Sequence, residues 1–369
     1  MWTLAKNKQW ESLNASFDWV SDMTGVPQDA VHHAEGDVAI HTQMVLSELM
    51  TLPEFHDLGE QEREVLWASA LLHDVEKRST TIVNPDGSIS SPGHAKKGMY
   101  TARGILYRHI PAEFIIREQI AKLVRFHGLP IWIFEKPDSQ KAAIMASLEV
   151  NTAWIAILAK ADMLGRICAD QDDMLYRVEC FREFCADLNC FGQGRPFATD
   201  TARVTYFQKE DSPVDYVPFE EPEFTVVLMS GLPGAGKDSF IRKYYGDWPV
   251  VSLDDLREQM GVVHGDKTGS GHVIQAAKEQ AKEYLRKKCP FVWNATNITR
   301  QMREQLISLF YTYKARVRIE YVEVPYRTLL QQNKNREAAI PVLAIERMID
   351  KLEVPVLNEA HEVNYHIKQ

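Results

Sequence analysis

The sequence is poor in the features that place a protein in or across a membrane. No apolar run approaches the roughly 18 to 20 residues of a membrane-spanning helix, and the first residues lack the apolar segment of a secretory signal peptide. The five cysteines are an odd number without a CxxC pair, which argues against a disulfide framework and a zinc knuckle. We therefore expect a soluble, cytoplasmic protein with reduced thiols and no membrane partner.

An excess of positive charge is also missing. Aspartate and glutamate number 51 against 42 lysines and arginines, which gives a formal net charge of -9. Without a general basic field, tight, salt-driven binding along extended nucleic acid is not expected, although a local pocket can still hold one strand end. The 369 residues, 45% of them hydrophobic, exceed what one ordinary core needs and predict two domains.

Two periodic patterns divide the chain. Residues 28–190 place apolar side chains three and four positions apart, which predicts an all-α domain over 1–191. Prolines and acidic residues collect in 192–223 and predict a linker, in which 202–207 has the composition of a short strand. Residues 224–369 alternate strands with helices, as in an α/β domain with a parallel sheet. Strands are expected at 224–229, 250–253, 291–293 and 317–322, and helices from 238, at 273–287 and at 300–313.

Four ligand-type side chains fall on apolar helical stripes of the first domain. They are His41, His73, His127 and Asp162. Any one of them alone is more often a satisfied core or surface residue. Because burying an imidazole or a carboxylate is costly unless it is paired or metal-bound, however, the four placements favour a shared metal site. A site so rich in imidazole favours manganese, iron, cobalt, nickel, copper or zinc over magnesium.

A glycine-rich loop from Gly231 to Lys237, with the sequence Gly-Leu-Pro-Gly-Ala-Gly-Lys, separates the first expected strand from a helix. Such a loop presents backbone N–H groups and a helix N-terminus to phosphate oxygens, while its lysine reaches the terminal phosphates. The expected contacts to ATP or another NTP are Gly231, Gly234, Ala235, Gly236, Lys237, Asp238 and Ser239. Asp238 stands where a serine or threonine usually holds magnesium, so either Asp238 or Ser239 can take the Mg²⁺ or Mn²⁺ ion.

Asp254 and Arg257 follow the second expected strand of this domain. A carboxylate at that place can accept the proton of an attacking hydroxyl, and an arginine one turn later can bind a substrate phosphate. Helix capping and an ordinary ion pair on a helix surface would produce the same residues. The position directly after the strand favours catalysis.

The second half, about residues 224–355, resembles the kinase domain of phage polynucleotide kinase and its end-healing relatives. The resemblance rests on the glycine loop, Asp254-Asp255-Leu-Arg257, Asn294-Ala-Thr-Asn297, and a lid-like segment from Val324 to Arg336. It implies Asp254 as general base, Arg257 on the phosphate beside the acceptor nucleotide, and Arg336 on the donor phosphates. One arginine of that family's lid is replaced here by Gln332.

The first half, roughly residues 28–170, resembles the HD phosphohydrolase superfamily in the order His41, His73-Asp74, Asp162. The resemblance adds Asp74 and His94 to the metal ligands, places His94 and His127 where two-metal members hold their second ion, and implies one ion or two, with Asp74 bridging a pair. His33 and Lys77 are candidate contacts to a substrate phosphate, or else solvated residues at helix ends. The segment around His33 is similar to the HD domain of bacterial tRNA nucleotidyltransferases, a branch associated with phosphatase and cyclic phosphodiesterase action on RNA ends.

Together the halves resemble the HD-Pnk family of bifunctional end-healing enzymes. This resemblance implies metal-dependent removal of 2′, 3′ or 2′,3′-cyclic phosphates, with Asp74 central, and NTP-dependent phosphorylation of a 5′-OH end by Lys237 and Asp254. The implied partners are RNA or DNA ends, an NTP and a polynucleotide ligase.

Two other interpretations remain open at this stage. The chain can be an enzyme of nucleotide metabolism, in which a nucleotide phosphohydrolase is joined to a nucleoside or small-molecule kinase. It can also be a switch, in which a non-catalytic metal-binding sensor regulates a P-loop ATPase. Arg257 argues against a bare nucleoside as acceptor because its charge is useful chiefly beside a phosphate.

Overall fold

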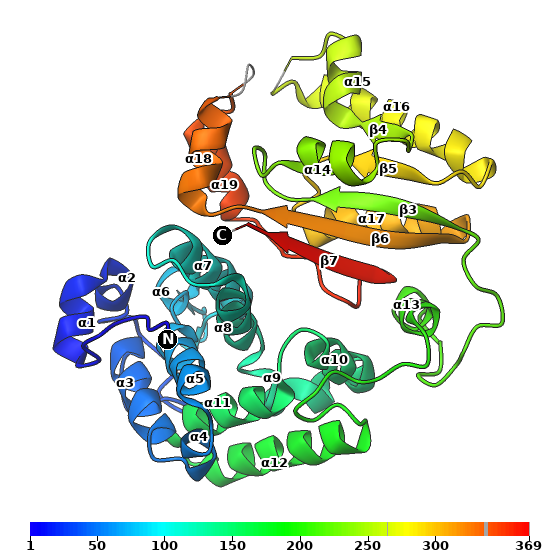
Figure 1. Cartoon of the computed structure of the whole chain (residues 1–369). Helices are drawn as coiled ribbons and strands as arrows, with labels where there is room; N and C mark the ends of the chain where they lie inside the picture. The colour runs from blue at the N-terminus through cyan, green and yellow to red at the C-terminus, as the bar shows by residue number, and fades with distance from the viewer. Residues whose placement is uncertain (264, 336–338, 369) are drawn as a thin grey trace. The chain divides into compact units, whose positions relative to one another are not determined.

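The computed structural model describes residues 1–263, 265–335 and 339–368, which divide into two compact units, Met1–Pro196 and Phe197–Gln369. Each unit has a hydrophobic core of its own. Figure 1 shows helices in the first unit and a twisted sheet in the second. The helical first half and the parallel sheet of the second half are confirmed.

The first unit is built from short and medium helices. In chain order they are α1 Trp10–Ser16, α2 Asp18–Ser21, α3 Val38–Leu49, α4 Pro53–His56, α5 Glu60–Leu72, α6 Lys77–Thr80, α7 His94–Arg108, α8 Phe114–Phe126, α9 Leu129–Trp132, α10 Ser139–Ser147, α11 Thr152–Leu164 and α12 Gln171–Asp187. A 3-10 turn, Ile133–Glu135, follows α9.

Helix α11 organises this unit because it is apolar on almost every side, as expected for a helix in the centre of a core. The side chain of Asn151 caps its first turn by accepting a hydrogen bond from the Ala153 amide. The helix packs against α3, α5, α8, α9 and α12. It therefore brings the site-bearing helices of the first unit to one place.

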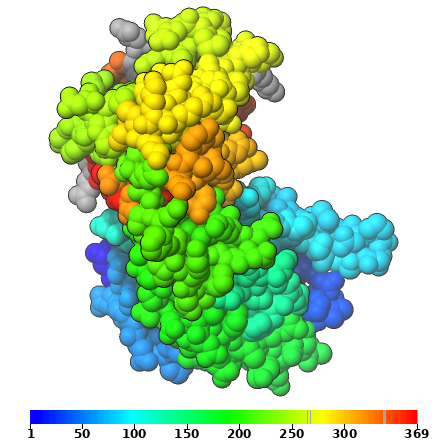
Figure 2. Space-filling model, turned by 90° about the vertical axis from the view of Figure 1, so that its right-hand side faces the viewer, coloured from blue at the N-terminus to red at the C-terminus, as the bar shows by residue number. Residues whose placement is uncertain are grey.

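The first unit is not entirely helical. A two-stranded antiparallel ribbon, β1 Ile82–Val83 and β2 Ile89–Ser90, projects from its surface (Figure 2).

Among the described residues, no single helix is long and apolar enough to cross a membrane. Helices α10 and α11 reach that length and composition only as a pair bent by 108°.

The second unit contains a five-stranded parallel sheet in the order β4-β5-β3-β6-β7. The strands are β3 Phe224–Ser230, β4 Val250–Ser252, β5 Phe291–Asn294, β6 Ala315–Glu323 and β7 Glu362–Ile367. The helices are α13 Asp200–Gln208, α14 Lys237–Tyr244, α15 Leu253–Gln259, α16 Lys267–Arg286, α17 Arg300–Thr312, α18 Tyr326–Lys334 and α19 Val342–Ile349. Buried Val226, Leu228 and Ile319 lie at the centre of its core.

All four strands expected from the sequence are present as β3 to β6, and β7 is additional. The strand expected at 202–207 is wrong, because this segment lies within helix α13. Thr199 caps α13 by accepting a hydrogen bond from the Ala202 amide. Arg203 then ties the helix to the carbonyl oxygens of Leu357 and His361. These contacts outweigh the weak strand preference of the local sequence.

Candidate metal centre and phosphate-loop site

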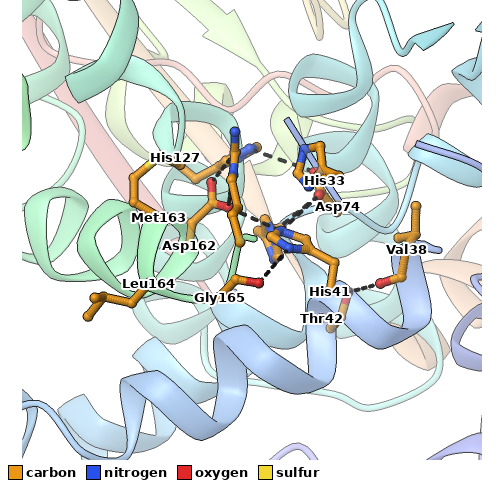
Figure 3. A network of polar contacts seen from close by, with 12 residues as sticks. His33, Val38, His41, Thr42, Asp74, His127, Asp162, Met163, Leu164 and Gly165 are labelled. Carbon is orange, nitrogen blue, oxygen red and sulfur yellow. Dashed lines mark hydrogen bonds and ion pairs between the residues drawn. The ribbon is translucent and has the colours of Figure 1, made fainter. Parts of the chain in front are cut away.

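The first unit brings a set of histidines and aspartates from five helices into one buried cluster. Its members are His41 in α3, His73 and Asp74 directly after α5, His94 at the start of α7, His127 directly after α8, and Asp162 in the last turn of α11. Figure 3 shows His41, Asp74, His127 and Asp162 turned towards one another. All of these side chains except that of His94 are almost completely buried.

Two groups of three within this cluster have a spacing that can hold a metal ion: His41, His73 and Asp162, and Asp74, His94 and His127. Asp74 lies between them. Its Oδ2 is 3.2 Å from His73 Nε2 and 3.7 Å from His41 Nε2, and its Oδ1 is 3.3 Å from His94 Nε2. A carboxylate in this position can bridge two ions.

Hydrogen bonds to the backbone fix the ring orientation of three histidines. The Nδ1 atoms of His73, His94 and His127 lie 2.7, 2.7 and 2.9 Å from the carbonyl oxygens of Ala70, Ser91 and Val124. Because a carbonyl only accepts, each Nδ1 must carry the hydrogen, which leaves the Nε2 lone pair of each neutral ring directed into the cluster. Metal-bound histidines are held in this way.

The inward-facing atoms need a positive charge between them. His94 Nε2 lies 3.4 Å from His127 Nε2, and His41 Nε2 lies 3.1 Å from Asp162 Oδ1. His41 Nδ1 lies 3.2 Å from the Gly165 carbonyl oxygen, which places its hydrogen on Nδ1 as well. In the neutral rings both of these pairs are therefore lone pair against lone pair. Among the described residues, the buried Nε2 atoms of His41 and His73 have no hydrogen-bond partner. The residues therefore fit bound cations.

The electrostatics favour the metal-binding form of four of the six ligands. Burial opposes ionisation of Asp74, but Lys77 and His73 outweigh it and hold the pKa of that carboxyl well below its usual value. For Asp162, burial is likewise outweighed, chiefly by Arg166, and its pKa is lowered. Burial lowers the pKa of His94 and brings the pKa of His127 to about 3. At neutral pH Asp74 and Asp162 are therefore carboxylates, and His94 and His127 are neutral imidazoles, the forms that bind metal. His73 is the exception: burial lowers its pKa, but the neighbouring Asp74 outweighs burial and raises it, so a metal ion binds His73 with release of a proton.

The two candidate substrate contacts, His33 and Lys77, are both buried rather than placed at solvated helix ends. The Lys77 ammonium lies 2.7 Å from Asp74 Oδ2 and donates to Gln28 at 2.7 Å. Two neighbours were not assigned from the sequence. Arg166 donates from Nε and Nη2 to the two carboxylate oxygens of Asp162 at 3.1 and 3.0 Å, and Glu35 accepts from His33 at 2.8 Å. The i,i+4 spacing of Asp162 and Arg166 was the available signal for that pair.

The glycine loop of the second unit requires its glycines for steric reasons. A Cβ atom on Gly231 would lie 2.3 Å from the Val322 carbonyl oxygen, which no side chain can tolerate. Gly234 and Gly236 have φ values of +83° and +97°, and Gly236 caps α14. The Lys237 ammonium donates to the carbonyl oxygens of Gly231 and Leu232 at 3.0 Å.

The loop opens into a cavity of about 830 Å³, which is large enough for a nucleotide and an acceptor group. Among the described residues, all the predicted nucleotide contacts except Gly231 and Ala235 line this cavity, together with Asp254, Arg257 and Gln332. Ser252, the last residue of β4, caps α15 by accepting a hydrogen bond from the Asp255 amide. Asp254 is exposed in the first turn of that helix. Arg336, expected on the donor phosphates, lies outside the described residues.

Two further contacts in this cavity bear on its chemistry. Arg257 donates to Ser270 at 3.0 Å, and its buried Nε has no hydrogen-bond partner within the described part of the chain. Asp238 accepts a hydrogen bond from Asn294, at the end of β5, at 2.8 Å. Ser239 also faces the cavity and accepts from Arg242.

Comparison with known protein families agrees with this geometry. Residues 226–355 match the family model described as an AAA domain. These residues form a P-loop kinase-like domain. This assignment supports binding of an NTP with Mg²⁺ and phosphotransferase activity. No match was found among curated proteins.

One of the matching solved structures is described as that of a proposed kinase from Chloroflexus aurantiacus J-10-fl. The two sequences are 14% identical. The match covers 40% of this chain and 87% of the chain in that structure, with a TM-score of 0.35.

Proposed function

We propose that the chain is a bifunctional end-healing enzyme that removes 2′ or 3′ terminal phosphates, including 2′,3′-cyclic ones, at the first unit and phosphorylates 5′-OH ends at the second. The proposal rests on one observation: the same chain has a buried histidine–aspartate cluster and a phosphate-loop cavity lined by Asp254 and Arg257. One chain with both sites can convert an end that a ligase rejects into one that it joins.

At the kinase site, the proposed roles follow from the position of each side chain. Lys237 leaves its loop carbonyls to bind the β- and γ-phosphates of the NTP. Asp254 accepts the proton of the attacking 5′-hydroxyl, since it is a solvent-accessible carboxylate facing the cavity. Arg257 binds the phosphate next to that hydroxyl, because its Nε is still unpartnered among the described residues.

At the phosphohydrolase site, we propose that His41, His73, Asp74, His94, His127 and Asp162 hold one or two transition-metal ions. Such ions, when bound, polarise the phosphate and activate a water molecule. Lys77 and Arg166 add positive charge at the edge of the cluster, where each is oriented by its aspartate. Lys77 and His33 are the proposed contacts to the leaving phosphate. The order of these ligands along the chain resembles that of HD phosphohydrolases.

The decisive experiment uses one oligonucleotide with a 5′-OH and a 3′-phosphate, incubated with the purified chain, ATP and a panel of divalent metals. We expect a 5′-phosphate to appear with Mg²⁺ or Mn²⁺ and the 3′-phosphate to be lost with transition metals. Transfer to mononucleosides combined with inert oligonucleotide ends would favour nucleotide metabolism instead. Absence of both reactions, with NTP binding retained, would support the sensor interpretation.

Arg257→Ala should lower kcat/KM for a 3′-nucleotide or an oligonucleotide acceptor by about 10- to 100-fold, the value of one charge-assisted hydrogen bond of roughly 1.5–3 kcal/mol. Transfer to the bare nucleoside should change little, because that acceptor offers Arg257 no phosphate. Steady-state kinetics with the two acceptors measure the ratio. Equal losses with both acceptors would assign Arg257 to the donor or to the fold.

We expect the carboxylate that binds magnesium at the kinase site to be Asp238, directly after the glycine loop, and not a residue at the end of a neighbouring strand. P-loop NTPases usually hold magnesium with a serine or threonine after the lysine and an aspartate from a neighbouring strand. Here Asp238 follows the loop lysine in the first turn of α14, Asn294 is at the end of β5, and the two are hydrogen-bonded. Asp238→Ala should therefore weaken Mn²⁺ binding to the protein–nucleotide complex by at least about tenfold, measured by electron paramagnetic resonance.

The double exchange Asp238→Ser with Asn294→Asp should restore most of that Mn²⁺ affinity, because it returns the usual arrangement. Ser239→Ala is the matched control on the adjacent residue and should leave Mn²⁺ affinity within about twofold, a change below roughly 0.5 kcal/mol. If Ser239→Ala loses the metal and Asp238→Ala keeps it, the ion is held by Ser239 instead.

A further inference from the structure

Glu35 is a buried carboxylate next to the metal centre that is not among the proposed ligands. It lies in the loop before α3, and its side chain is fully buried. A carboxylate in such a place must be compensated by hydrogen bonds, since burial of an unpaired charge is strongly unfavourable. The three groups that compensate the charge of Glu35 indicate its role.

Three N–H groups lie against this carboxylate, and that of His41 is shared with the Gly165 carbonyl. Its Oε1 lies 2.8 Å from His33 Nδ1 and 3.0 Å from His41 Nδ1, and its Oε2 accepts from the Ile167 amide at 2.9 Å. An ionised carboxylate has no hydrogen to donate, so both imidazole Nδ1 atoms must carry one. Each neutral ring then has its lone pair on Nε2, and that of His41 points at the cluster, 3.1 Å from Asp162.

The same contacts join the two chain segments that carry ligands. The Ala34 amide donates to the Ile167 carbonyl at 2.9 Å, and the Gly165 carbonyl lies 3.2 Å from His41 Nδ1. A Cβ on Gly165 would come within 2.7 Å of Val45, so this close approach to α3 requires glycine. The loop before α3 is thereby fastened to the end of α11, close to Asp162.

The ligand atoms of His33, Glu35 and His41 also lie close enough together to hold a metal ion, but their distances fit hydrogen bonds better. The separations of 2.8 and 3.0 Å from Glu35 are ordinary hydrogen-bond lengths. Nitrogen and oxygen ligands on a tetrahedral ion with bonds of about 2.0 to 2.2 Å lie about 3.3 to 3.5 Å apart. The separations within the cluster run from 3.1 to 3.8 Å and include that value. Glu35 is placed to orient ligands, not to bind the ion.

We propose that Glu35 is a positioning residue that selects the metal-binding tautomer of His41 and holds His33 in the matching orientation with the same oxygen atom. This inference rests on the metal centre of the proposed function. It gives the loop before α3, which contains none of the proposed metal ligands, a role in metal affinity.

Glu35→Gln tests this role because it keeps the size of the side chain and removes one acceptor. If the amide oxygen faces the histidines, the amide nitrogen meets the Ile167 N–H, donor against donor. If the amide is reversed, it donates to Nδ1 of His41 and forces the hydrogen onto Nε2, where a metal must bind. Either orientation should weaken metal binding by about 10- to 100-fold, as is usual for partners of metal-bound histidines.

The measurement is Co²⁺ binding to the full chain by calorimetry, with the Co²⁺ absorption spectrum at saturation as a report on the nitrogen ligands. Glu54→Gln is the control, because Glu54 also accepts a hydrogen bond, from Lys160 at 2.7 Å, but lies outside the cluster. We expect Glu54→Gln to match the wild type. Equal Co²⁺ affinity and spectrum in Glu35→Gln would overturn the role of Glu35, whereas a wild-type chain that binds no Co²⁺ would remove the metal centre itself.

A second measurement needs no variant and covers the case in which Glu35→Gln fails to fold. Two-bond ¹⁵N–¹H spectra of the metal-free wild-type protein report which ring nitrogen carries the hydrogen. His33 and His41 should both be protonated at Nδ1. An Nε2–H signal from either ring as the main form would contradict the proposal.

Discussion

Asp74→Asn should reduce hydrolysis of 3′-phosphate ends by at least about 1,000-fold, which corresponds to roughly 4 kcal/mol of lost transition-state stabilisation. Asp74 is the carboxylate that lies between the two groups of metal-type ligands, with oxygens 3.2 to 3.3 Å from His73 and His94. Asparagine keeps the shape of the side chain but offers a single neutral oxygen, so it cannot bridge two cations. Release of inorganic phosphate from the 3′-phosphate oligonucleotide measures the loss.

The same variant should retain 5′-kinase activity within about twofold, a difference below roughly 0.5 kcal/mol. This expectation follows from the composition of the two sites, since the proposed ligands belong to the first unit and the glycine loop belongs to the second. Asp57→Asn, which alters an exposed aspartate outside the cluster, is the matched control. Unchanged phosphate release by Asp74→Asn would refute the ligand set, and a joint loss of both activities would show that the sites are interdependent.

The sequence predicted the parts of both sites that lie on periodic elements. His41 and Asp162 were visible because a polar residue interrupts an apolar stripe of helical period, and such an interruption is costly without a partner. Four strands were visible as short runs of apolar and β-branched residues beside turns. These signals are local, and the structure confirms the elements to which they belong.

The sequence did not predict features that depend on contacts between distant segments. Glu35 lies in a loop without periodicity, and its meaning comes from Ile167, which is 132 residues away. Strand β7 is an edge strand whose pairing with β6 is set by the fold rather than by its own composition. Helix α13 was mistaken for a strand because its stabilising partners, the carbonyl oxygens bound by Arg203, lie more than 150 residues later.

Asp254→Asn should lower kcat of the 5′-kinase reaction by about 100- to 10,000-fold, the range in which general base catalysis contributes. Asp254 occupies the first turn of α15, directly after the strand β4, and its carboxylate is accessible in the cavity that the glycine loop forms. Asparagine can hydrogen-bond the acceptor hydroxyl but cannot take its proton. KM for the acceptor should therefore change much less than kcat, and removal of 3′-phosphates should be unaffected.

Asp255→Asn is the natural control for Asp254, since the neighbouring carboxylate is equally exposed in the same helical turn and has the same electrostatic effect on α15. A general loss of negative charge beside the phosphates would affect both variants alike. A proton acceptor, in contrast, must lie within hydrogen-bond reach of one hydroxyl, so only one of the two adjacent positions can serve. A larger loss of kcat in Asp255→Asn than in Asp254→Asn would transfer the role of general base to the second aspartate.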